Sequence, residues 1–213
     1  MTITRIALIR HGETDWNKTG RWQGHAPIPL NEEGLLQARK MAAYIANRAM
    51  PISAIYSSDL SRCQVTAQAL AAKIKLEVQL DVRLREINIG RWQGLTHDEI
   101  MAWDSNYYHQ RERDQLNIPL PGGESSNDVA ARAGYVVRSI VEKHPGQWVA
   151  VVTHGGVVRN LLRFLGILPF PPPPVENTSI TLISHEEGRW ILEYANRTEH
   201  LSADEHLDWS GEG

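Results

Sequence analysis

The sequence predicts an α/β fold of three layers, in which helices cover both faces of a mostly parallel central sheet. Two apolar runs, residues 5–9 and 148–153, contain almost no charged side chains, which is typical of central strands that are buried on both faces. Segments with strand and helix periodicity alternate along the chain. This alternation favours parallel pairing, because two parallel strands need a helix-length connection.

The first half of the chain shows the alternation clearly. Residues 13–29 are polar, with glycines and prolines, and predict a loop that crosses the end of the sheet. Asn31 is a suitable N-cap for a helix with apolar residues at helical spacing, and Pro51 breaks this helix. Residues 52–56 predict a second strand, and the polar residues 57–59 are suited to capping the next helix.

That next helix is expected over about residues 60–73, with a weak third strand at 76–78. In the two helices, periodicity places these residues on the inward face: Leu35, Ala38, Ala42, Ile45, Val65, Ala69 and Ala72. Thr96 with Glu99 then forms a capping-box pattern, which predicts the start of a helix toward Trp103.

Residues 104–123 are polar and aromatic, and we expect an excursion or lid there. Ser125 with Asp128 starts a long helix that Pro145 ends. The remaining elements are expected to be a strand at 148–153, a helix at 157–165, a polyproline-type connector at 169–174 and a hairpin of strands at 178–184 and 190–195. A chain of this length suits a single domain over residues 1–213.

Composition narrows the class of protein. Cys63 is the single cysteine, which excludes an intramolecular disulfide framework and suits a reducing compartment. No apolar run approaches the roughly 20 residues that span a bilayer, and the N-terminus lacks the features of a signal peptide. The formal net charge is -3, without a dense block of lysine and arginine. We therefore expect a cytoplasmic protein with neither a membrane nor a nucleic acid as partner.

Both buried strands end on a histidine followed by a glycine. These are His11-Gly12, which follow Arg10, and His154-Gly155. The carboxyl ends of parallel strands lie at one edge of a sheet, where open α/β folds bind ligands. Each histidine could simply cap its strand, but two of them, each with a glycine that permits close approach, favour a functional site. A permanent positive charge at Arg10 favours an anionic ligand.

Arg62 is a second candidate for binding an anion. It lies in the first turn of the helix expected over residues 60–73, where a cation opposes the helix dipole by ~0.3–1 kcal/mol. Backbone N–H groups and a guanidinium directed at one point make an anion site. The alternative is an ion pair with Asp59 on the surface.

Glu86 lies between apolar residues that should draw it partly into the protein. A half-buried carboxylic acid has a raised pKa and can act as a general acid near neutral pH. The alternative is an ion pair with Arg83 or Arg85. Two histidines with Glu86 could also hold zinc. Arg10 and Arg62 would repel a cation from the same pocket, so no metal is expected.

Five sequence blocks together resemble the histidine phosphatase superfamily, specifically its phosphoglycerate mutase-like branch. The blocks are Arg10-His11-Gly12-Glu13 with Asn17 and Gln23-Gly24, Ser57-Ser58-Asp59-Leu60-Ser61-Arg62 with Thr66-Ala67, Leu84-Arg85-Glu86 with Gly90, Trp92 and Gly94, Gly122-Gly123-Glu124-Ser125, and His154-Gly155. They occur in the order of the family and extend over most of the chain, from Arg5 to about Ser179.

The resemblance implies a metal-independent phosphomonoesterase that acts on a small phosphorylated metabolite. His11 would attack phosphorus and become phosphohistidine, which divides one transfer into two steps. Arg10, Arg62 and His154 would hold the phosphoryl oxygens. Glu86 would protonate the leaving alkoxide and then deprotonate water. The phosphate cradle would be completed by Asn17, Gln23 and the backbone N–H groups near Gly24 and Gly155. No cofactor is implied.

The sequence departs from the mutases of this branch. Those mutases have a long insertion after the block of Glu86 and a second arginine soon after Arg62, where this chain has Cys63-Gln64-Val65. This favours a phosphoric monoester hydrolase of the histidine acid phosphatase type over a 2,3-bisphosphoglycerate-dependent phosphoglycerate mutase. A module that binds a phosphorylated ligand without turnover is the alternative of another class, and the filled catalytic positions argue against it.

Substrate identity is expected to depend on Trp22, His25, residues 104–120 and the pair Tyr107-Tyr108, whose rings could stack on a sugar or base. The candidates are phosphosugars, phosphoglycerate-type acids, phosphoserine and nucleotide-loop phosphates such as α-ribazole phosphate, and the sequence does not rank them. It also leaves a homodimer open.

Overall fold

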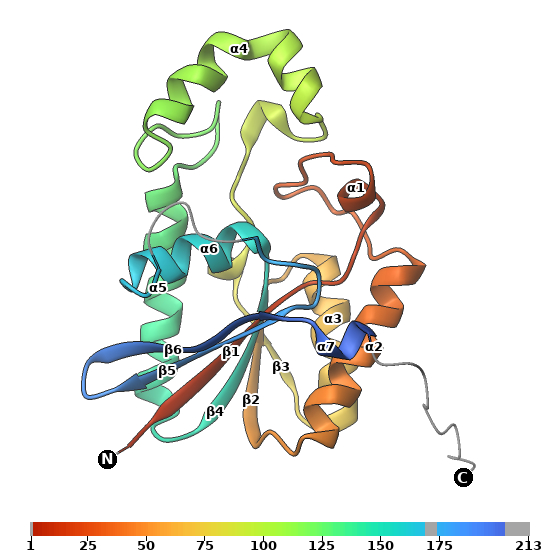
Figure 1. Ribbon diagram of the computed structural model, residues 1–213, viewed down its shortest axis with the longest axis vertical. Helices are drawn as coiled ribbons and strands as arrows, with labels where there is room; N and C mark the ends of the chain where they lie inside the picture. Colours follow the sequence, from red (N-terminus) through yellow and green to blue (C-terminus); the bar gives the residue numbers. More distant parts are fainter. Residues whose placement is uncertain (1, 169–173, 203–213) are drawn as a thin grey trace.

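The structure is a computed structural model that describes residues 2–168 and 174–202. The described residues form a sheet of six strands in the order β3-β2-β4-β1-β5-β6 (Figure 1). The strands are β1 Thr4–Arg10, β2 Ile52–Ser57, β3 Val78–Leu80, β4 Trp148–Thr153, β5 Ile180–Glu186 and β6 Arg189–Arg197. β1, β4, β2 and β3 pair in parallel, whereas β5 is antiparallel to β1 and β6. The mostly parallel sheet is confirmed.

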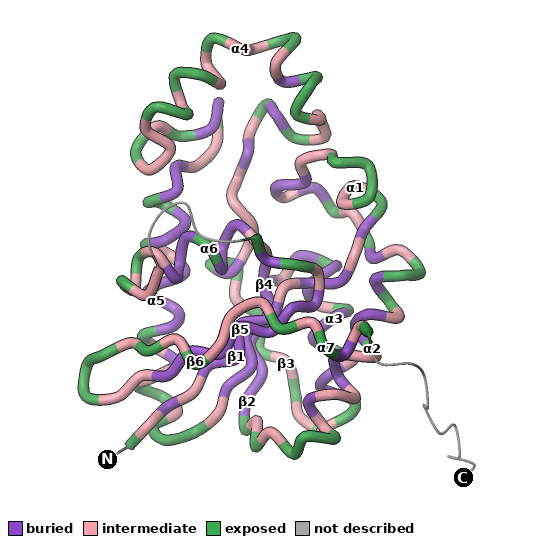
Figure 2. Tube along the Cα trace, in the orientation of Figure 1, coloured by how far each residue is buried: buried purple, intermediate pink, exposed green. Residues whose placement is uncertain are grey.

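Helices cover both faces of this sheet and produce the expected three layers. They are α1 Asp15–Lys18, α2 Glu32–Asn47, α3 Ser61–Ile74, α4 His97–Arg113, α5 Ser126–Lys143, α6 Gly155–Phe164 and α7 Glu199–Ser202, with single 3-10 turns η1 Val82–Leu84 and η2 Gly90–Trp92. Side chains alternate along β1, so Ile6 and Leu8 pack with α5 and α6, while Ala7 and Ile9 pack with α2 and α3. The buried positions follow the strands and the inner helix faces (Figure 2).

The inward faces of α2 and α3 differ from the expectation. Leu35 and Val65 are 38% and 37% exposed, and Ala72 is also exposed. The other expected residues are buried or half-buried: Ala38, Ala42, Ile45 and Ala69. The expectation counted only apolar residues, but the buried face of α3 includes the polar residues Arg62 and Thr66. Because these two polar residues are buried, the face that α3 turns toward the core differs from the face that its apolar residues predict.

Three connecting segments also correct the sequence prediction. The loop over residues 13–29 contains α1, whose N-cap Thr14 forms a capping box with Asn17. The N-cap of α3 is Leu60, which makes no side-chain cap, rather than the polar residues before it. β3 begins two residues later than expected, because its residues 78–80 pair with the end of β2.

α4 extends well beyond its expected end at Trp103, so the excursion expected over residues 104–123 is helical as far as Arg113. Asp104 interrupts the helix with φ -141° and ψ 37° and accepts a hydrogen bond of 3.2 Å from the Trp92 indole. α4 lies beyond the carboxyl ends of the strands (Figure 1). A separate apolar cluster supports it, formed by Ile89, Trp92, Ile100 and Leu120.

The end of the chain follows the expectation where the structure describes it. The expected hairpin is formed by β5 and β6, which turn at Glu187 and Gly188. Residues 169–173 of the expected polyproline connector lie outside the described residues. No helix in the described ranges is long and apolar enough to cross a membrane.

Candidate active site

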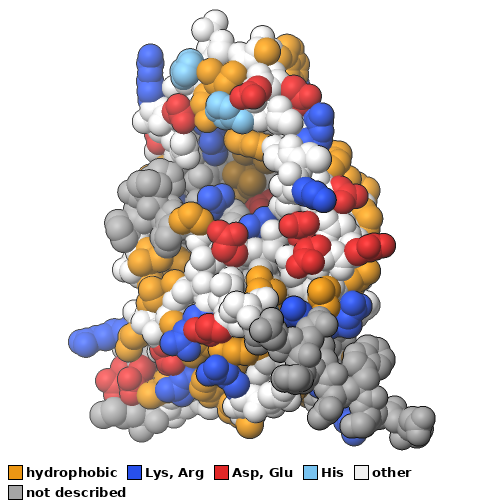
Figure 3. All heavy atoms as spheres, turned by 45° about the vertical axis from the view of Figure 1, so that its right-hand side comes forward, with side chains coloured by type: hydrophobic (Ala, Val, Ile, Leu, Met, Phe, Trp, Pro, Cys, Tyr) orange, Lys and Arg blue, Asp and Glu red, His pale blue; other side chains and the backbone are white. Residues whose placement is uncertain are grey.

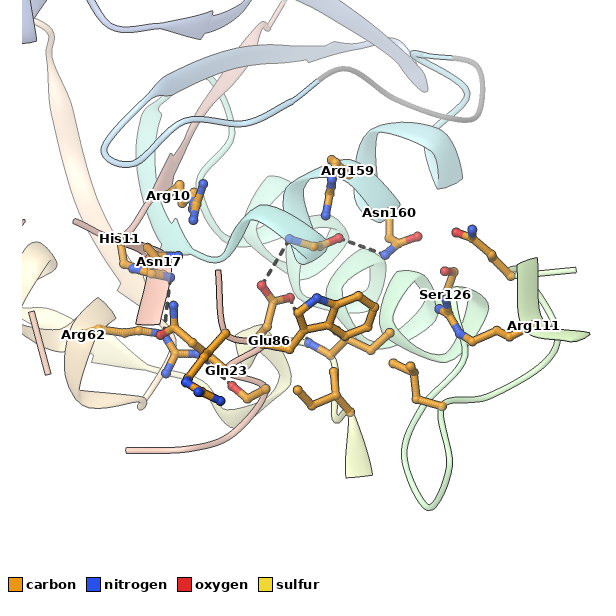
Figure 4. Close-up of a pocket in the computed structure, with 18 residues that line it drawn as sticks. Arg10, His11, Asn17, Gln23, Arg62, Glu86, Arg111, Ser126, Arg159 and Asn160 are labelled. Atoms are coloured by element: carbon orange, nitrogen blue, oxygen red, sulfur yellow. Dashed lines mark hydrogen bonds between the residues drawn. The ribbon is translucent and has the colours of Figure 1, made fainter. Parts of the chain in front are cut away.

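A cavity of about 380 Å³ lies at the carboxyl ends of β1 and β4, between the sheet and the region of α4. The surface is hollowed below the top of the molecule, and Lys and Arg side chains gather there (Figure 3). The sequence-predicted residues that line the cavity are Arg10, His11, Asn17, Gln23, Gly24, Arg62 and Glu86 (Figure 4). His154 and Gly155 are not part of this lining, which includes Gly156 instead.

The two histidines meet because β1 and β4 pair in register. Arg10 lies opposite Thr153, and the backbone N–H of His11 donates to the carbonyl of Thr153 at 2.9 Å. His154, which is fully buried, lies behind His11 with the ring centroids 5.2 Å apart and the rings edge-on. The expectation that both strand ends converge is therefore confirmed.

His11 has one ring nitrogen held and one directed at an arginine. Its Nδ1 is 2.7 Å from the carbonyl oxygen of Gly12. A carbonyl only accepts hydrogen bonds, so Nδ1 holds the proton and the lone pair lies on Nε2. The Nε–H of Arg62 donates to this Nε2 at 3.3 Å. Burial, and then the charges of Arg62 and Arg10, hold the pKa of His11 well below its usual range, so the imidazole is neutral near pH 7.

Arg62 is fully buried, which overturns the alternative of a surface ion pair with Asp59. Its terminal nitrogens donate to the carbonyls of Ala26 at 2.9 Å and Gly24 at 2.8 Å. Asp59 binds Arg85 instead, at 2.5 Å. Burial lowers the pKa of Arg62 from its ordinary value. The guanidinium stays charged, because arginine is not deprotonated in proteins. A cation held in this way by neutral carbonyls is suited to an incoming anion.

Arg10 is also held by its backbone surroundings. One terminal nitrogen donates to the carbonyl of Val175 at 2.6 Å. Its Nε is buried and has no hydrogen-bond partner among the described residues. Gly155 lies beside this side chain, since a Cβ built there would be 3.5 Å from Cδ and Nε of Arg10. Arg10 and Arg62 thus direct two guanidinium groups toward His11, as Figure 4 shows.

Glu86 lies at the N-terminus of α6. Its two carboxylate oxygens accept hydrogen bonds from the backbone N–H of Gly156 at 3.2 Å and of Ile87 at 2.9 Å. A Cβ at Gly156 would come within 2.4 Å of the Glu86 carboxylate, so this close approach requires glycine. The alternative of an ion pair is wrong, because Arg83 and Arg85 bind Asp81 and Asp59.

Polar neighbours hold the ring of His154 through its Nε2. Its Nε2 is 3.0 Å from the hydroxyl of Ser58 and 3.3 Å from Sγ of Cys63. The Ser58 oxygen accepts the N–H of Leu60, and the Cys63 thiol donates to the carbonyl of Thr153. A hydroxyl can donate one hydrogen bond and accept two, so Ser58 can serve as donor or acceptor toward Nε2 of His154. Burial, and then Arg62 and His11, hold the pKa of His154 well below its usual range.

Two side-chain amides line the same end of the cavity. Oδ1 of Asn17 accepts the N–H and the hydroxyl of Thr14, so its NH₂ group remains for a ligand. Gln23 is largely buried, and its Oε1 has no hydrogen-bond partner in the described part of the chain. Both positions are consistent with donors to a phosphoryl group.

The cavity also has lining residues that the sequence analysis did not name individually. They are Arg21, Arg111, Gln115, Ser126, Gly156, Arg159 and Asn160, with apolar residues. Arg159 and Asn160 follow Gly156 by three and four residues on α6, so helical periodicity could have placed them on its cavity face. Arg111 and Gln115 lie in the segment 104–120 that was expected to decide substrate identity, but which of its side chains reach the cavity depends on how α4 folds back over the sheet.

The residues expected to decide substrate identity separate into two groups. Trp22 lines the cavity. His25 contacts the backbone carbonyl of Glu86 at 2.7 Å through Nε2. Tyr107 and Tyr108 pack against Trp92 and support α4 rather than line the cavity. In the ranges that the structure describes, no group of three or more His, Cys, Asp and Glu side chains is placed to hold a metal ion.

The chain is similar to proteins of a known family. The family model described as "Histidine phosphatase superfamily (branch 1)" matches residues 6–198. "Phosphoglycerate mutase-like protein 4" of Arabidopsis thaliana is 36% identical over 199 residues, which cover 92% of this chain and 86% of the relative. "Metal-independent phosphoserine phosphatase" of the same plant is 35% identical over 204 residues, with 94% and 84% covered.

A third relative shares its name with a protein of known structure. "Glucosyl-3-phosphoglycerate phosphatase" of Mycobacterium tuberculosis is 36% identical over 225 residues, which cover 96% of this chain and 99% of the relative. A mycobacterial glucosyl-3-phosphoglycerate phosphatase structure in complex with VO3 superposes with a TM-score of 0.83 at 36% identity, covering 91% of this chain and 99% of that one.

Proposed function

The chain belongs to branch 1 of the histidine phosphatase superfamily, and we propose that it hydrolyses a small phosphorylated metabolite through a phosphohistidine at His11. The phosphatases among its relatives support a phosphoric monoester hydrolase. The observation that carries the proposal for the nucleophile is the Nδ1 contact of His11 with Gly12, which leaves Nε2 unprotonated beside Arg62.

In the first step, Nε2 of His11 attacks phosphorus, an N–P bond forms, and the bond to the leaving oxygen breaks. Arg10 and Arg62 meet the negative charge of the phosphoryl oxygens, and Asn17 and Gln23 offer amide donors. With Ser58 as the donor to its Nε2, His154 has its ring proton on Nδ1, where it can donate to the phosphoryl group. The positive charge for the transfer comes from the arginines, in accord with the name of the metal-independent relative.

Glu86 moves the protons of both steps. In its acid form it gives a proton to the departing alkoxide. The resulting carboxylate then takes a proton from water, whose oxygen attacks phosphorus, releases inorganic phosphate and regenerates His11. The two backbone N–H groups that hold Glu86 fix its orientation for both transfers.

The experiment is a hydrolysis assay with p-nitrophenyl phosphate in EDTA. We expect wild-type turnover and a fall of about 10³-fold or more in His11→Ala. A short incubation followed by mass spectrometry should find the phosphoryl group on His11. Absence of turnover on this ester and on a panel of phosphorylated metabolites would favour a module that binds a phosphorylated ligand without reacting.

A mutase is the second candidate, because some relatives have names that include phosphoglycerate mutase, such as "Probable phosphoglycerate mutase GpmB" of Yersinia pestis. Supplying 3-phosphoglycerate with catalytic 2,3-bisphosphoglycerate separates the two activities. We expect release of inorganic phosphate. Rapid formation of 2-phosphoglycerate with little free phosphate would replace the phosphatase by a mutase.

The proposal includes the cytoplasm as the compartment, since the single cysteine, Cys63, is a buried free thiol. Immunodetection in fractionated cells is the direct test, and recovery in an extracytoplasmic or membrane fraction would contradict it.

A further inference from the structure

The cavity has two ends with different chemistry. Arg10, His11 and Arg62 gather at one end, which we call the phosphoryl end (Figure 4). Arg111 and Ser126 lie at the opposite end, which we call the distal end, and Arg159 and Asn160 of α6 lie between the two (Figure 4). The proposed chemistry uses only the phosphoryl end and Glu86. The distal residues therefore need another explanation.

The charges of the lining are unbalanced. Five arginines line the cavity: Arg10, Arg21, Arg62, Arg111 and Arg159. Among the described lining residues, Glu86 is the single acid. Arg21 is neutralised outside the cavity by Glu99 at 2.8 Å, and a phosphoryl dianion would be met by Arg10 and Arg62. A phosphoryl group alone leaves Arg111 and Arg159 without an anion inside the cavity. Glu112, the acid that acts on Arg111 from α4, is not part of the lining.

Arg111 has the features of an anion-binding residue rather than a solvated one. Its Nε is buried and has no hydrogen-bond partner in the described ranges. Burial lowers the pKa of Arg111 from its ordinary value, which reports partial loss of water around the guanidinium. A desolvated donor without a partner costs stability, and an anion in the cavity would recover that cost.

Neighbouring groups at the distal end add polar atoms without negative charge. Asn160 is mostly buried, lines the cavity and donates its amide to the carbonyl of Gly156 at 2.9 Å. Ser126 is 5% exposed and lines the cavity beside Arg111 (Figure 4). A cavity of about 380 Å³ holds only a small molecule, so both ends can be reached by one metabolite.

We propose that the distal end binds a second anionic group of the substrate, a carboxylate or a second phosphate, and that Arg111 is the residue that selects it. The inference rests on the proposed function and narrows its substrate class. Phosphosugars without a second charge become poor substrates, because their bound state leaves the Arg111 guanidinium unpaired. Charged esters of the phosphoglycerate or bisphosphate kind become good ones.

The test compares substrates that differ in one group. The pair 3-phosphoglycerate and glycerol 3-phosphate differs by a carboxylate in place of a hydroxymethyl group, and the pair fructose 1,6-bisphosphate and fructose 6-phosphate by a second phosphate. We expect wild-type kcat/KM, measured by released phosphate, to favour the charged member of one pair by about 10- to 100-fold. The pair that shows the preference identifies the anion.

Variants of α4 assign that preference. Arg111→Gln should bring the kcat/KM ratio of the discriminating pair close to one, whereas Arg111→Lys should retain much of it. Arg113→Gln is the matched control, because Arg113 is an exposed arginine on the same helix, outside the cavity lining. It should keep the wild-type ratio.

Two outcomes would overturn the inference while leaving the phosphatase intact. One is a wild-type ratio near one for both pairs, which needs no variant and so does not depend on whether Arg111→Gln folds. The other is an unchanged ratio in a folded Arg111→Gln protein. Failure of the proposed function would look different, since p-nitrophenyl phosphate would then not be hydrolysed at all.

Discussion

At the level of single residues, one polar contact holds a ring nitrogen of each active-site histidine. A backbone carbonyl holds Nδ1 of His11, and the Ser58 hydroxyl contacts Nε2 of His154. In the proposed reaction the two rings have complementary roles: His11 presents a lone pair, and His154, with Ser58 as the donor to its Nε2, presents Nδ1–H. Both rings are buried beside Arg62. Burial and this positive charge keep the rings neutral, so His11 retains the lone pair with which it attacks phosphorus.

Ser58 is a positioning residue, and its substitution tests this division of roles. In Ser58→Ala, Nε2 of His154 loses its donor and the ring can place its proton there, away from the phosphoryl group. We expect vanadate inhibition and kcat/KM to weaken by about 3- to 10-fold, the size of one neutral hydrogen bond. Ser58→Thr, which retains the hydroxyl, should recover most of the loss.

The control is Ser61→Ala, an exposed serine at the start of α3. It should retain wild-type vanadate affinity. Equal losses in Ser58→Ala and Ser58→Thr would assign the effect to packing and would argue against control of the tautomer.

At the level of elements, the N-terminus of α6 places the proposed acid. Gly156 gives Glu86 both an N–H donor and the space that a side chain would occupy. The same helix turn directs Arg159 and Asn160 toward the cavity. A single helix end therefore links the acid to the lining between the phosphoryl and distal ends.

Gly156→Ala should displace the Glu86 carboxylate, because the added Cβ would lie 2.4 Å from it. We expect kcat/KM on an alkyl phosphate such as 3-phosphoglycerate to fall by about 10²-fold, the lower range of general acid catalysis. This ratio reports the steps up to loss of the leaving group and leaves out the later hydrolysis of phosphohistidine, which both esters share. The loss on p-nitrophenyl phosphate should be smaller, since p-nitrophenolate leaves without a proton. Glu86→Gln should reproduce this pattern. Equal losses on both esters would count against Glu86 as the acid.

At the level of the whole molecule, the C-terminal helix is tied to the nucleophile. His200 on α7 is 3.1 Å from the hydroxyl of Thr178, a residue held at φ 53°. The N–H of Thr178 and the amide of Asn177 both donate to the carbonyl of His11. Tyr44 on α2 donates to Glu199 at 2.7 Å and fixes the same helix.

This link makes stability depend on pH. Burial lowers the pKa of His200 to about 4, against about 6.5 in the unfolded chain. The unfolded state therefore binds the proton first, and the contribution of His200 is present above pH 6.5 and lost as the pH falls toward 4. Its slope is at most about 1.4 kcal/mol per pH unit.

Urea unfolding across that pH range tests the link. The free energy of unfolding of His200→Gln should fall less steeply with acid than that of wild type, with a remaining slope from His11 and His154, whose pKa values are lowered in the same direction. His97→Gln, at an exposed histidine of α4, should keep the wild-type slope. A wild-type slope in His200→Gln would refute the assignment.

Local signals in the sequence were sufficient for much of the fold. The apolar runs at β1 and β4 identified the central strands, and the capping boxes at Thr96 and Ser125 fixed the starts of α4 and α5. These signals succeed because burial on both faces and end-capping depend on neighbouring residues alone. The phase of α3 was wrong because its inward face was decided by a polar residue, Arg62.

What the sequence determined by itself was the phosphoryl end, since the residues at two strand ends and one helix start must meet at one edge of a parallel sheet. Tertiary structure alone decided the distal end, because Arg111 reaches the cavity only after α4 bends at Asp104 and packs on Trp92. It also decided that Glu86 binds backbone N–H groups instead of a neighbouring arginine. Contacts between residues distant in the chain depend on packing, which local patterns do not encode.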